Sequence, residues 1–337
     1  MLVENIVQKV SVLLKKANYE TFTIEEKNKY CFDLLVKKES AILLIKVFSN
    51  IDNLNMSIIN GIKSMSILLK SKPILIGIKN RYQKLEDNTI YIREDLPFIT
   101  YNTFENTILN QSYPYVLARR GGGVIFLDGV QMKELREKKN INRKGLSEEL
   151  EVTKRTICSY ENESMRPSQQ IAEKIIKILE DPKQTIFKSI NIFEWNVKFN
   201  INDEHSFAGQ ELSPFESHIQ DVIQDIGIEA HWYKKGLTPF EMSIHCNKYE
   251  RNCEENAIFP LFSKVPSEKG KASELSFKYF LYMFSQLFQK KGIFIVDNDF
   301  RISDTIRNKK IPILKMKNLE KIDNEFEFVE FIQKDES

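Results

Sequence analysis

Basic and polar side chains recur between Lys154 and Asn162 at spacings that place them on one face of a helix. A Lys or Arg on such a face can donate hydrogen bonds to guanine O6 and N7, and a planar guanidinium can engage both acceptors at once. The pattern therefore predicts a helix over residues 154–162 that reads base edges in the major groove of DNA. The predicted contact residues are Lys154, Arg155, Thr156, Ser159 and Asn162.

A block of helices from Val130 to about Glu180 must position this face. Thr153 is the predicted N-cap of the reading helix, because its hydroxyl can accept a hydrogen bond from an orphan backbone N–H. Arg143 and Lys144 begin the preceding helix, where cations and backbone N–H groups can hold phosphate. The apolar positions that recur at helical spacing predict one core, formed by Met132, Leu135, Leu146, Leu150, Val152, Ile157, Tyr160, Ile171, Ile175 and Ile178.

This block resembles the lambda-repressor/Cro-like helix-turn-helix family. The resemblance rests on a spaced pattern made up of Leu146, Val152, Thr153, Thr156, Ile157, Tyr160, Glu161 and Arg166-Pro167-Ser168. It implies base-reading positions for Lys154, Arg155 and Ser159, and phosphate contacts for Arg143 and Asn162. Glu151 and Glu163 replace glycines that are frequent in the family, so Glu151 needs a left-handed backbone and Glu163 adds negative charge near the DNA side. The alternative is a plain helical bundle with a solvated basic surface.

The segments on either side of the helical block read as small α/β domains with mixed sheets. In the first, a hairpin is expected from Cys31–Lys37 and Ala41–Phe48 around the turn Lys38–Ser40, followed by the helix Ile58–Leu69. Its further strands are Lys72–Ile78 and Thr89–Ile92. The third block repeats this order with the helix Phe215–Ile226, a strand around His231, Glu241–Cys246 paired with Ala257–Val265, the helix Ser273–Gln289, and the strands Gly292–Asp297 and Ile311–Met316. We hypothesise an ancient duplication.

Five regions follow from this reading. They are an N-terminal α/β domain over 1–112, a hairpin or hinge over 113–129, the helix-turn-helix domain over 130–182, a linker over 183–213 and a C-terminal α/β domain over 214–337. Gly121, Gly122 and Gly123 interrupt the extended runs Tyr115–Arg119 and Val124–Asp128, which favours a hairpin because glycine adopts positive φ readily. A phosphate-binding role for these glycines is disfavoured, because no Walker or dinucleotide-binding register follows.

The first block resembles the restriction-endonuclease-like fold, whose nucleases hold Mg²⁺ with two acids beside a lysine. Asp33 and Lys46 are weak candidates for one acid and for the lysine, but Leu44 occupies the position of the second acid. In the third block Glu241 and Lys264 correspond, and Phe262 occupies the acid position. We therefore expect a retained fold with a lost metal site.

A zinc site is a second metal reading, at His245, Cys246 and Cys253. The spacing Cys–x6–Cys is unusual for zinc and no fourth ligand is near, so incidental cysteines are favoured. We predict no metal and no cofactor.

Composition and hydropathy argue against a disordered, a membrane-spanning or a secreted protein. Lys+Arg 49 and Asp+Glu 47 leave a net charge of +2, and hydrophobic residues make up 42%, which argues against wholesale disorder. No window of about 18 uncharged apolar residues predicts a membrane span, and the N-terminus lacks the apolar stretch of a signal peptide. We expect a cytoplasmic protein with no membrane partner.

Together the three blocks look like an archaeal family of transcriptional regulators with the same central module. The expected function is sequence-specific binding of double-stranded DNA by a homodimer that regulates transcription. The alternatives are a Mg²⁺-dependent nuclease targeted by the helical module, and an adaptor whose helical module binds protein instead of DNA. The sequence identifies no small-molecule effector.

Overall fold

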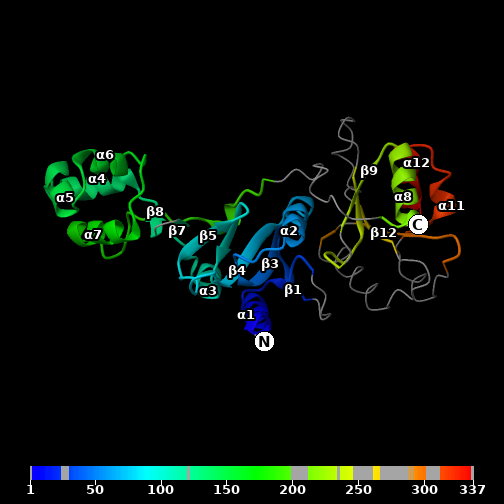
Figure 1. Ribbon diagram of the computed structural model, residues 1–337, viewed down its shortest axis with the longest axis horizontal. Coiled ribbons are helices and arrows are strands. Elements are labelled where there is room, and N and C mark those ends of the chain that lie inside the picture. Colours follow the sequence, from blue (N-terminus) through cyan, green and yellow to red (C-terminus); the bar gives the residue numbers. More distant parts are fainter. Residues whose placement is uncertain are drawn as a thin grey trace. The chain divides into compact units, whose positions relative to one another are not determined.

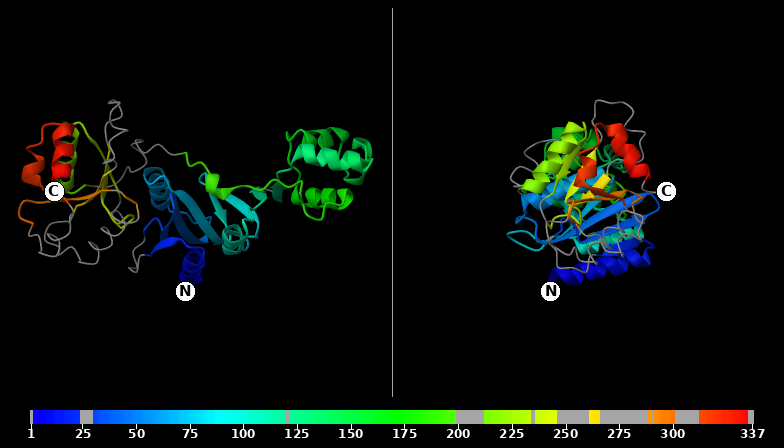
Figure 2. Two further views of the ribbon diagram at one scale, coloured as in Figure 1. Left: turned by 180° about the vertical axis from the view of Figure 1, so that it is seen from behind. Right: turned by 90° about the vertical axis from the view of Figure 1, so that its right-hand side faces the viewer.

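The computed structural model describes residues 2–23, 30–119, 122–198, 212–233, 236–245, 261–265, 288–289, 291–300 and 312–334 of the 337-residue chain. The chain divides into two compact units. Residues 1–21, 43–54 and 72–197 form the first unit, and residues 22–42, 55–71 and 198–337 form the second. Figures 1 and 2 show the elements of each unit. In the ranges described, no helix combines the length and apolar character that crossing a membrane requires.

The first unit contains a mixed sheet in which the strand order is β3-β4-β6-β5-β7-β8. Strands β3 and β4 are parallel, as are β4 and β6, whereas β5 is antiparallel to β6 and parallel to β7. The bounds are β3 Ala41–Asn50, β4 Lys72–Lys79, β5 Thr89–Arg93, β6 Leu96–Ile99, β7 Val116–Arg119 and β8 Gly122–Ile125. The long buried runs of β3 and β4 fit a parallel pair covered on both faces.

Helices α1 (Leu2–Lys16) and α3 (Tyr101–Asn110) contact each other in this unit, where the Lys9 ammonium lies 5.8 Å from the centroid of the Tyr101 ring. The sequence analysis did not predict β6 or α3. Proline is uncommon inside strands, so Pro97 argued against a strand at β6. In the structure Pro97 lies opposite Ile92 in the antiparallel pair of β6 with β5. Thr100 caps α3, whose asparagine-rich sequence has weak helix propensity.

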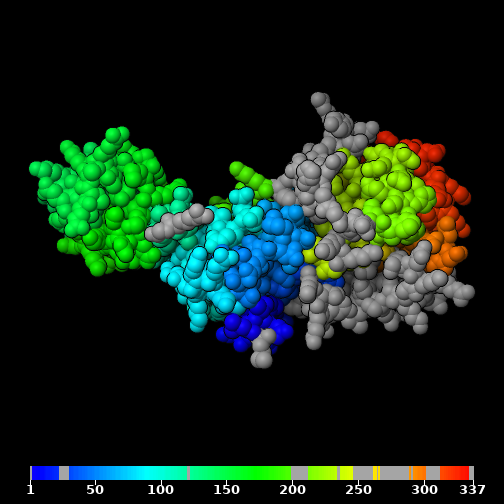
Figure 3. Space-filling view, viewed as in Figure 1, coloured from blue at the N-terminus to red at the C-terminus, as the bar shows by residue number. Residues whose placement is uncertain are grey.

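Strands β7 and β8 form the expected antiparallel hairpin, with Arg119 opposite Gly122. Gly122 and Gly123 begin the second strand, so β8 starts earlier than the predicted run from Val124. Four helices follow as one compact group, drawn in green in Figures 1 and 3. Their bounds are α4 Gly129–Lys138, α5 Arg143–Glu149, α6 Lys154–Glu161 and α7 Gln169–Leu179.

The chain that leaves α7 is hydrogen-bonded to the segment that entered α4. Backbone N–H groups of Lys188 and Ile190 donate to the carbonyls of Phe126 and Pro114 at 2.8 and 2.7 Å. A short 3₁₀ helix, Ile192–Glu194, follows, and the Trp195 indole then donates to the Asp95 carbonyl at 2.9 Å. Both chain segments that connect the four helices to the sheet are therefore held by hydrogen bonds.

The second unit contains a five-stranded mixed sheet of order β13-β12-β11-β10-β9. Strands β9, β10 and β11 are antiparallel neighbours, and β11, β12 and β13 are parallel. The bounds are β9 Glu229–Trp232, β10 Met242–His245, β11 Leu261–Lys264, β12 Gly292–Val296, β13 Ile313–Lys315, α8 Pro214–Asp225, α11 Met316–Leu319 and α12 Glu325–Lys334. The predicted pairing of the strands around Glu241–Cys246 and Ala257–Val265 is confirmed for the residues described.

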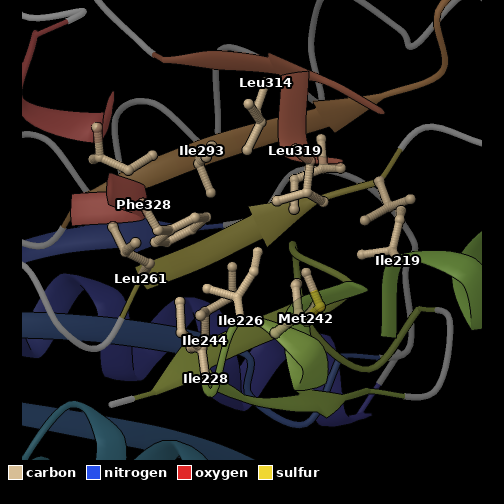
Figure 4. Close-up of a cluster of buried hydrophobic side chains, with 14 of the residues drawn as sticks. Ile219, Ile226, Ile228, Met242, Ile244, Leu261, Ile293, Leu314, Leu319 and Phe328 are labelled. Atoms are coloured by element: carbon tan, nitrogen blue, oxygen red, sulfur yellow. The ribbon is translucent and has the colours of Figure 1, made fainter. Parts of the chain in front are cut away.

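Alternate residues of these strands pack against α8, α11 and α12 to form one apolar core (Figure 4). Ile219 of α8 and Phe328 of α12 contribute fully buried side chains to it. The predicted helix Ser273–Gln289 lies outside the described residues, except that Phe288 and Gln289 are not helical.

The other elements that lie wholly or partly in this unit are β1 (Glu20–Thr23), β2 (Leu34–Lys38) and α2 (Met56–Leu68). The expected turn after β2 is present at Glu39, where φ is 53°. Two hydrogen bonds join these early residues to the late ones: the Cys31 N–H donates to the Leu237 carbonyl at 2.8 Å, and the hydroxyls of Ser64 and Tyr233 lie 2.7 Å apart. Burial raises the pKa of Tyr233 to about 12.

The two parallel strand pairs, β3–β4 and β11–β12, share a register. Lys46 lies opposite Leu75 in the first pair, and Lys264 lies opposite Phe294 in the second. When KPILIGIKN at 72–80 is aligned with KGIFIVDND at 291–299, Leu75 and Phe294 occupy the same position. The shared register supports the duplication hypothesis, because unrelated sheets have no reason to pair equivalent residues.

Candidate nucleic-acid interface

Side-chain caps define where the two central helices of the module begin. The Asn142 side chain accepts a hydrogen bond from the Gly145 N–H at 2.9 Å, and the Thr153 hydroxyl accepts one from the Thr156 N–H at 3.1 Å. The turn between the helices passes through Glu151, whose φ is 55°. The left-handed backbone expected at Glu151 is therefore present.

Buried apolar side chains fix which face of α6 points outward. Ile157 is fully buried and Tyr160 is 3% exposed, and burial raises the pKa of the Tyr160 hydroxyl. The buried apolar side chains of the four helices and of the adjoining β7–β8 segment form one core cluster. Every predicted core residue belongs to this cluster or packs against it. The sequence analysis missed Ala172 and Leu179, which are also fully buried in it.

The predicted contact residues of α6 lie on the opposite face or at its end. Lys154, Arg155 and Asn162 are exposed, whereas Thr156 and Ser159 are half-buried. The Thr156 hydroxyl lies 2.8 Å from that of Thr153, so it is engaged at the cap. Long, exposed cations at the start of a helix have the reach that contact with base edges requires. The base-reading roles remain predictions.

The two basic residues that begin α5 differ in their surroundings. Lys144 is exposed, with its ammonium 3.8 Å from the Glu148 carboxylate. Arg143 Nε donates to Glu161 Oε2 at 2.8 Å, and this hydrogen bond raises the pKa of the guanidinium. Arg143 is thus held against the module by Glu161, while 35% of its side chain remains exposed.

Glu161 is a positioning residue that the sequence analysis placed only in the family register. Its side chain is 1% exposed, and its other carboxylate oxygen accepts from Arg136 Nε at 2.6 Å. Arg136 is itself buried and donates through Nη1 to the Ile141 carbonyl at 2.8 Å. Helical spacing could have predicted the burial of Glu161, because Glu161 follows Ile157 by four residues and so lies on the same buried face of α6.

Glu163, the second glycine replacement, also has positive φ, at 58°. Its carboxylate accepts from Lys188 Nζ at 2.6 Å and from the Gly129 N–H at 3.2 Å. These bonds lower the pKa of the Glu163 carboxyl, with the Lys188 bond contributing most. The negative charge expected near the DNA side is therefore compensated by Lys188, which follows the module in the chain, and by the Gly129 N–H.

At both candidate nuclease positions the residue two before the lysine is apolar and buried. Leu44 is fully buried on β3 at the position of the missing acid, and Phe262 is likewise buried on β11. Glu241 Oε2 accepts from the Val265 N–H at 2.9 Å, which ties this carboxylate to the backbone. Asp33 precedes β2 and Lys46 lies within β3.

The zinc reading is only partly covered by the described residues. His245 Nε2 lies 3.0 Å from the Ser243 hydroxyl, and Cys246 and Cys253 lie outside the described residues. Among the residues that are described, no group of three His, Cys, Asp or Glu side chains is arranged to hold a metal ion.

Comparison with protein families identifies two of the three blocks. Residues 3–114 match the PD-(D/E)XK superfamily domain, and residues 132–180 match the helix-turn-helix family. These matches confirm the restriction-endonuclease-like fold of the first block and the helix-turn-helix of the second. A second mixed sheet follows them in the chain, as predicted.

Several archaeal proteins align with nearly the whole chain. A "Putative HTH-type transcriptional regulatory protein" of Methanococcus maripaludis strain C6 is 29% identical over 308 residues, which is 90% of each chain. Those of Methanothermobacter thermautotrophicus and Methanocaldococcus jannaschii are each 27% identical, and the matches cover 98% and 90% of this chain and 96% and 88% of theirs. Over nearly its whole length the chain is therefore similar to archaeal proteins that carry this name, and it joins a PD-(D/E)XK superfamily domain to a helix-turn-helix module.

Proposed function

We propose that the protein is a sequence-specific regulator of transcription that occupies operator DNA through α6. The observation that carries the proposal is the division of α6 into two faces: Ile157 and Tyr160 anchor the helix in the core, while Lys154 and Arg155 project from its first turn into solvent. Packing thus holds the cations on a rigid element that fits the major groove.

The remaining predicted residues have supporting roles in this proposal. Ser159 and Asn162 lie farther along α6, and Arg143 and Lys144 at the start of α5 hold the flanking phosphates. The buried Glu161 carboxylate bonds the Arg143 guanidinium, so the side chain that would contact phosphate is anchored to the core of the module. The protein acts in the cytoplasm without a cofactor.

A homodimer is the proposed binding species. Two copies would place two α6 helices in successive major grooves about 34 Å apart, so the operator would be a two-fold repeat. Selection of bound sites from random duplex DNA tests this part, because a dimer enriches palindromes and a monomer enriches single half-sites.

Titration of a selected duplex with the Lys154→Ala/Arg155→Ala variant tests the reading helix. We expect a loss of about 1–3 kcal/mol for each base-reading side chain, together with weaker discrimination against mutated sites. Lys174→Ala/Lys177→Ala is the matched control, since it removes two exposed cations from α7 and should leave discrimination unchanged. If the α6 variant discriminates as well as the wild type, the assignment of α6 is wrong.

The second candidate function is a metal-dependent nuclease. The PD-(D/E)XK match favours it, and the apolar residues Leu44 and Phe262 at the positions of the metal-binding acids argue against it. We propose that the chain does not cleave DNA, because the side chain two residues before Lys46 is the buried, apolar Leu44. A divalent ion needs several oxygen ligands, and one carboxylate holds it poorly.

A further inference from the structure

The β7–β8 hairpin exposes the Arg119 guanidinium and the backbone of Gly122 to solvent. Arg119 is exposed at the end of β7 and lies opposite Gly122. Gly122 has φ +129°, which disfavours any other residue, and among the described residues outside its chain neighbours a Cβ added there would meet no atom within 4 Å. The chain is therefore open to close approach at this point, beside a guanidinium whose geometry suits a phosphate.

The second strand of this hairpin is fastened to the loop that follows α6. The Ile125 N–H donates to the Pro167 carbonyl at 3.1 Å, and Val124 forms a bridge with Ser168, the N-cap of α7. The Arg166 guanidinium lies 3.7 Å from the centroid of the Phe126 ring. The hairpin thus moves with the module that carries α6.

Positive charge extends along this strand. Arg166 is exposed beside Phe126, which is four residues from Gly122, the partner of Arg119. At about 3.3 Å per residue the two strand positions are about 13 Å apart, the rise of about four base pairs. The nearby Glu163 carboxylate is bound by Lys188 and the Gly129 N–H, which offsets its repulsion of a phosphate.

We propose that the β7–β8 hairpin is a second DNA-contacting element, which holds the phosphate backbone beside the groove that α6 occupies. This inference rests on the proposed function, because it takes the same duplex as its partner. Arg119 contacts phosphate and reads no base, so it adds affinity that is independent of sequence.

The experiment is a salt titration of the full-length chain on a selected duplex and on an unrelated duplex. Arg119→Ala should weaken binding to both duplexes about equally and reduce the slope of log K against log[salt] by about 0.9, the value for one phosphate contact. Arg119→Lys should keep the slope. Lys84→Ala, which removes an exposed cation from the β4–β5 connection, should leave slope and affinity unchanged.

The outcomes separate this inference from the proposed function. An unchanged slope in Arg119→Ala would overturn the hairpin contact, even where Lys154→Ala/Arg155→Ala still loses discrimination. A reduced slope would support the hairpin contact, even if the α6 variant discriminates normally and the proposed reading helix fails. Equal thermal unfolding of wild type and Arg119→Ala checks that the hairpin is intact.

Discussion

Glu161 is the residue on which the geometry of the reading helix most depends. Its buried carboxylate bonds Arg136 and Arg143, so α6 is linked to α4 and to the start of α5. Glu161→Gln should destabilise the module by roughly 3–5 kcal/mol, because it removes the buried counter-ion of Arg136 and leaves only the exposed Glu137 beside that charge. Chemical unfolding measures this loss.

The matched control for that variant is Glu137→Gln. Glu137 bonds the same arginine at 3.3 Å but is 55% exposed, so its loss should change stability by less than about 1 kcal/mol. Equal effects of the two substitutions would show that burial of the Glu161 pair is not what stabilises the module.

The Glu163 carboxylate makes stability depend on pH. Its pKa is lowered in the folded chain, so its contribution is complete above the unfolded pKa of about 4.3 and is lost as pH falls through the folded value. Glu163 and Lys188 are 41% and 42% exposed, so screening limits the effect to a few tenths of a kcal/mol.

Glu163→Gln should therefore be slightly less stable than the wild type at pH 7 and equally stable at about pH 2. The glutamine can still accept the Gly129 N–H, so the difference isolates the charge. Unfolding free energies at the two pH values provide the measurement. A difference that persists at low pH would mean that packing, and not ionisation, is responsible.

At the scale of elements, α4 and α6 approach so closely that only glycine fits between them. A Cβ at Gly129 would lie 2.1 Å from the Glu161 carbonyl oxygen and 2.9 Å from that of Tyr160. Both are backbone atoms, so the helices would have to separate. Gly129→Ala should destabilise the module by about 1–3 kcal/mol.

Gly145 provides a control of opposite sign for that substitution. It lies inside α5, and an added Cβ would meet only the Asn142 side chain, at 3.8 Å. Gly145→Ala should therefore stabilise the chain by about 0.5–1 kcal/mol through helix propensity. Thermal unfolding of the two variants compares them, and destabilisation of both would contradict the close-approach argument.

At the scale of the whole molecule, a domain of a nuclease superfamily shares a chain with a DNA-binding module. We expect that the full-length protein leaves its selected duplex uncut in Mg²⁺, because Leu44 and Phe262 replace the metal-binding acids. Gel analysis of the incubated duplex is the measurement. Cleavage that disappears in Lys46→Ala/Lys264→Ala would refute the expectation, whereas cleavage that survives the loss of both lysines identifies a contaminating nuclease.

Local sequence was sufficient for the module that carries the candidate site. The cap at Thr153 and the apolar residues at helical spacing are short-range signals, and they predicted the helices and the exposed face of α6. Asn142 and Ser168, which were not predicted as caps, are equally local signals for the starts of α5 and α7. Local sequence was insufficient for β6 and α3, because Pro97 in β6 and the three asparagines of α3 disfavour these elements locally. Pairing with β4 and β5 and packing against α1 overcome those preferences.

The sequence by itself determined that this chain carries a helix-turn-helix with basic residues at the start of its reading helix, because periodicity and capping are written in neighbouring residues. Only the tertiary structure decided that Glu161 bonds two arginines, that Lys188 compensates Glu163, and that the β7–β8 hairpin is fastened beside α7. Each of these contacts joins residues far apart in the chain. Which residues meet in such contacts depends on how the elements pack, and the sequence pattern of neighbouring residues does not predict that packing.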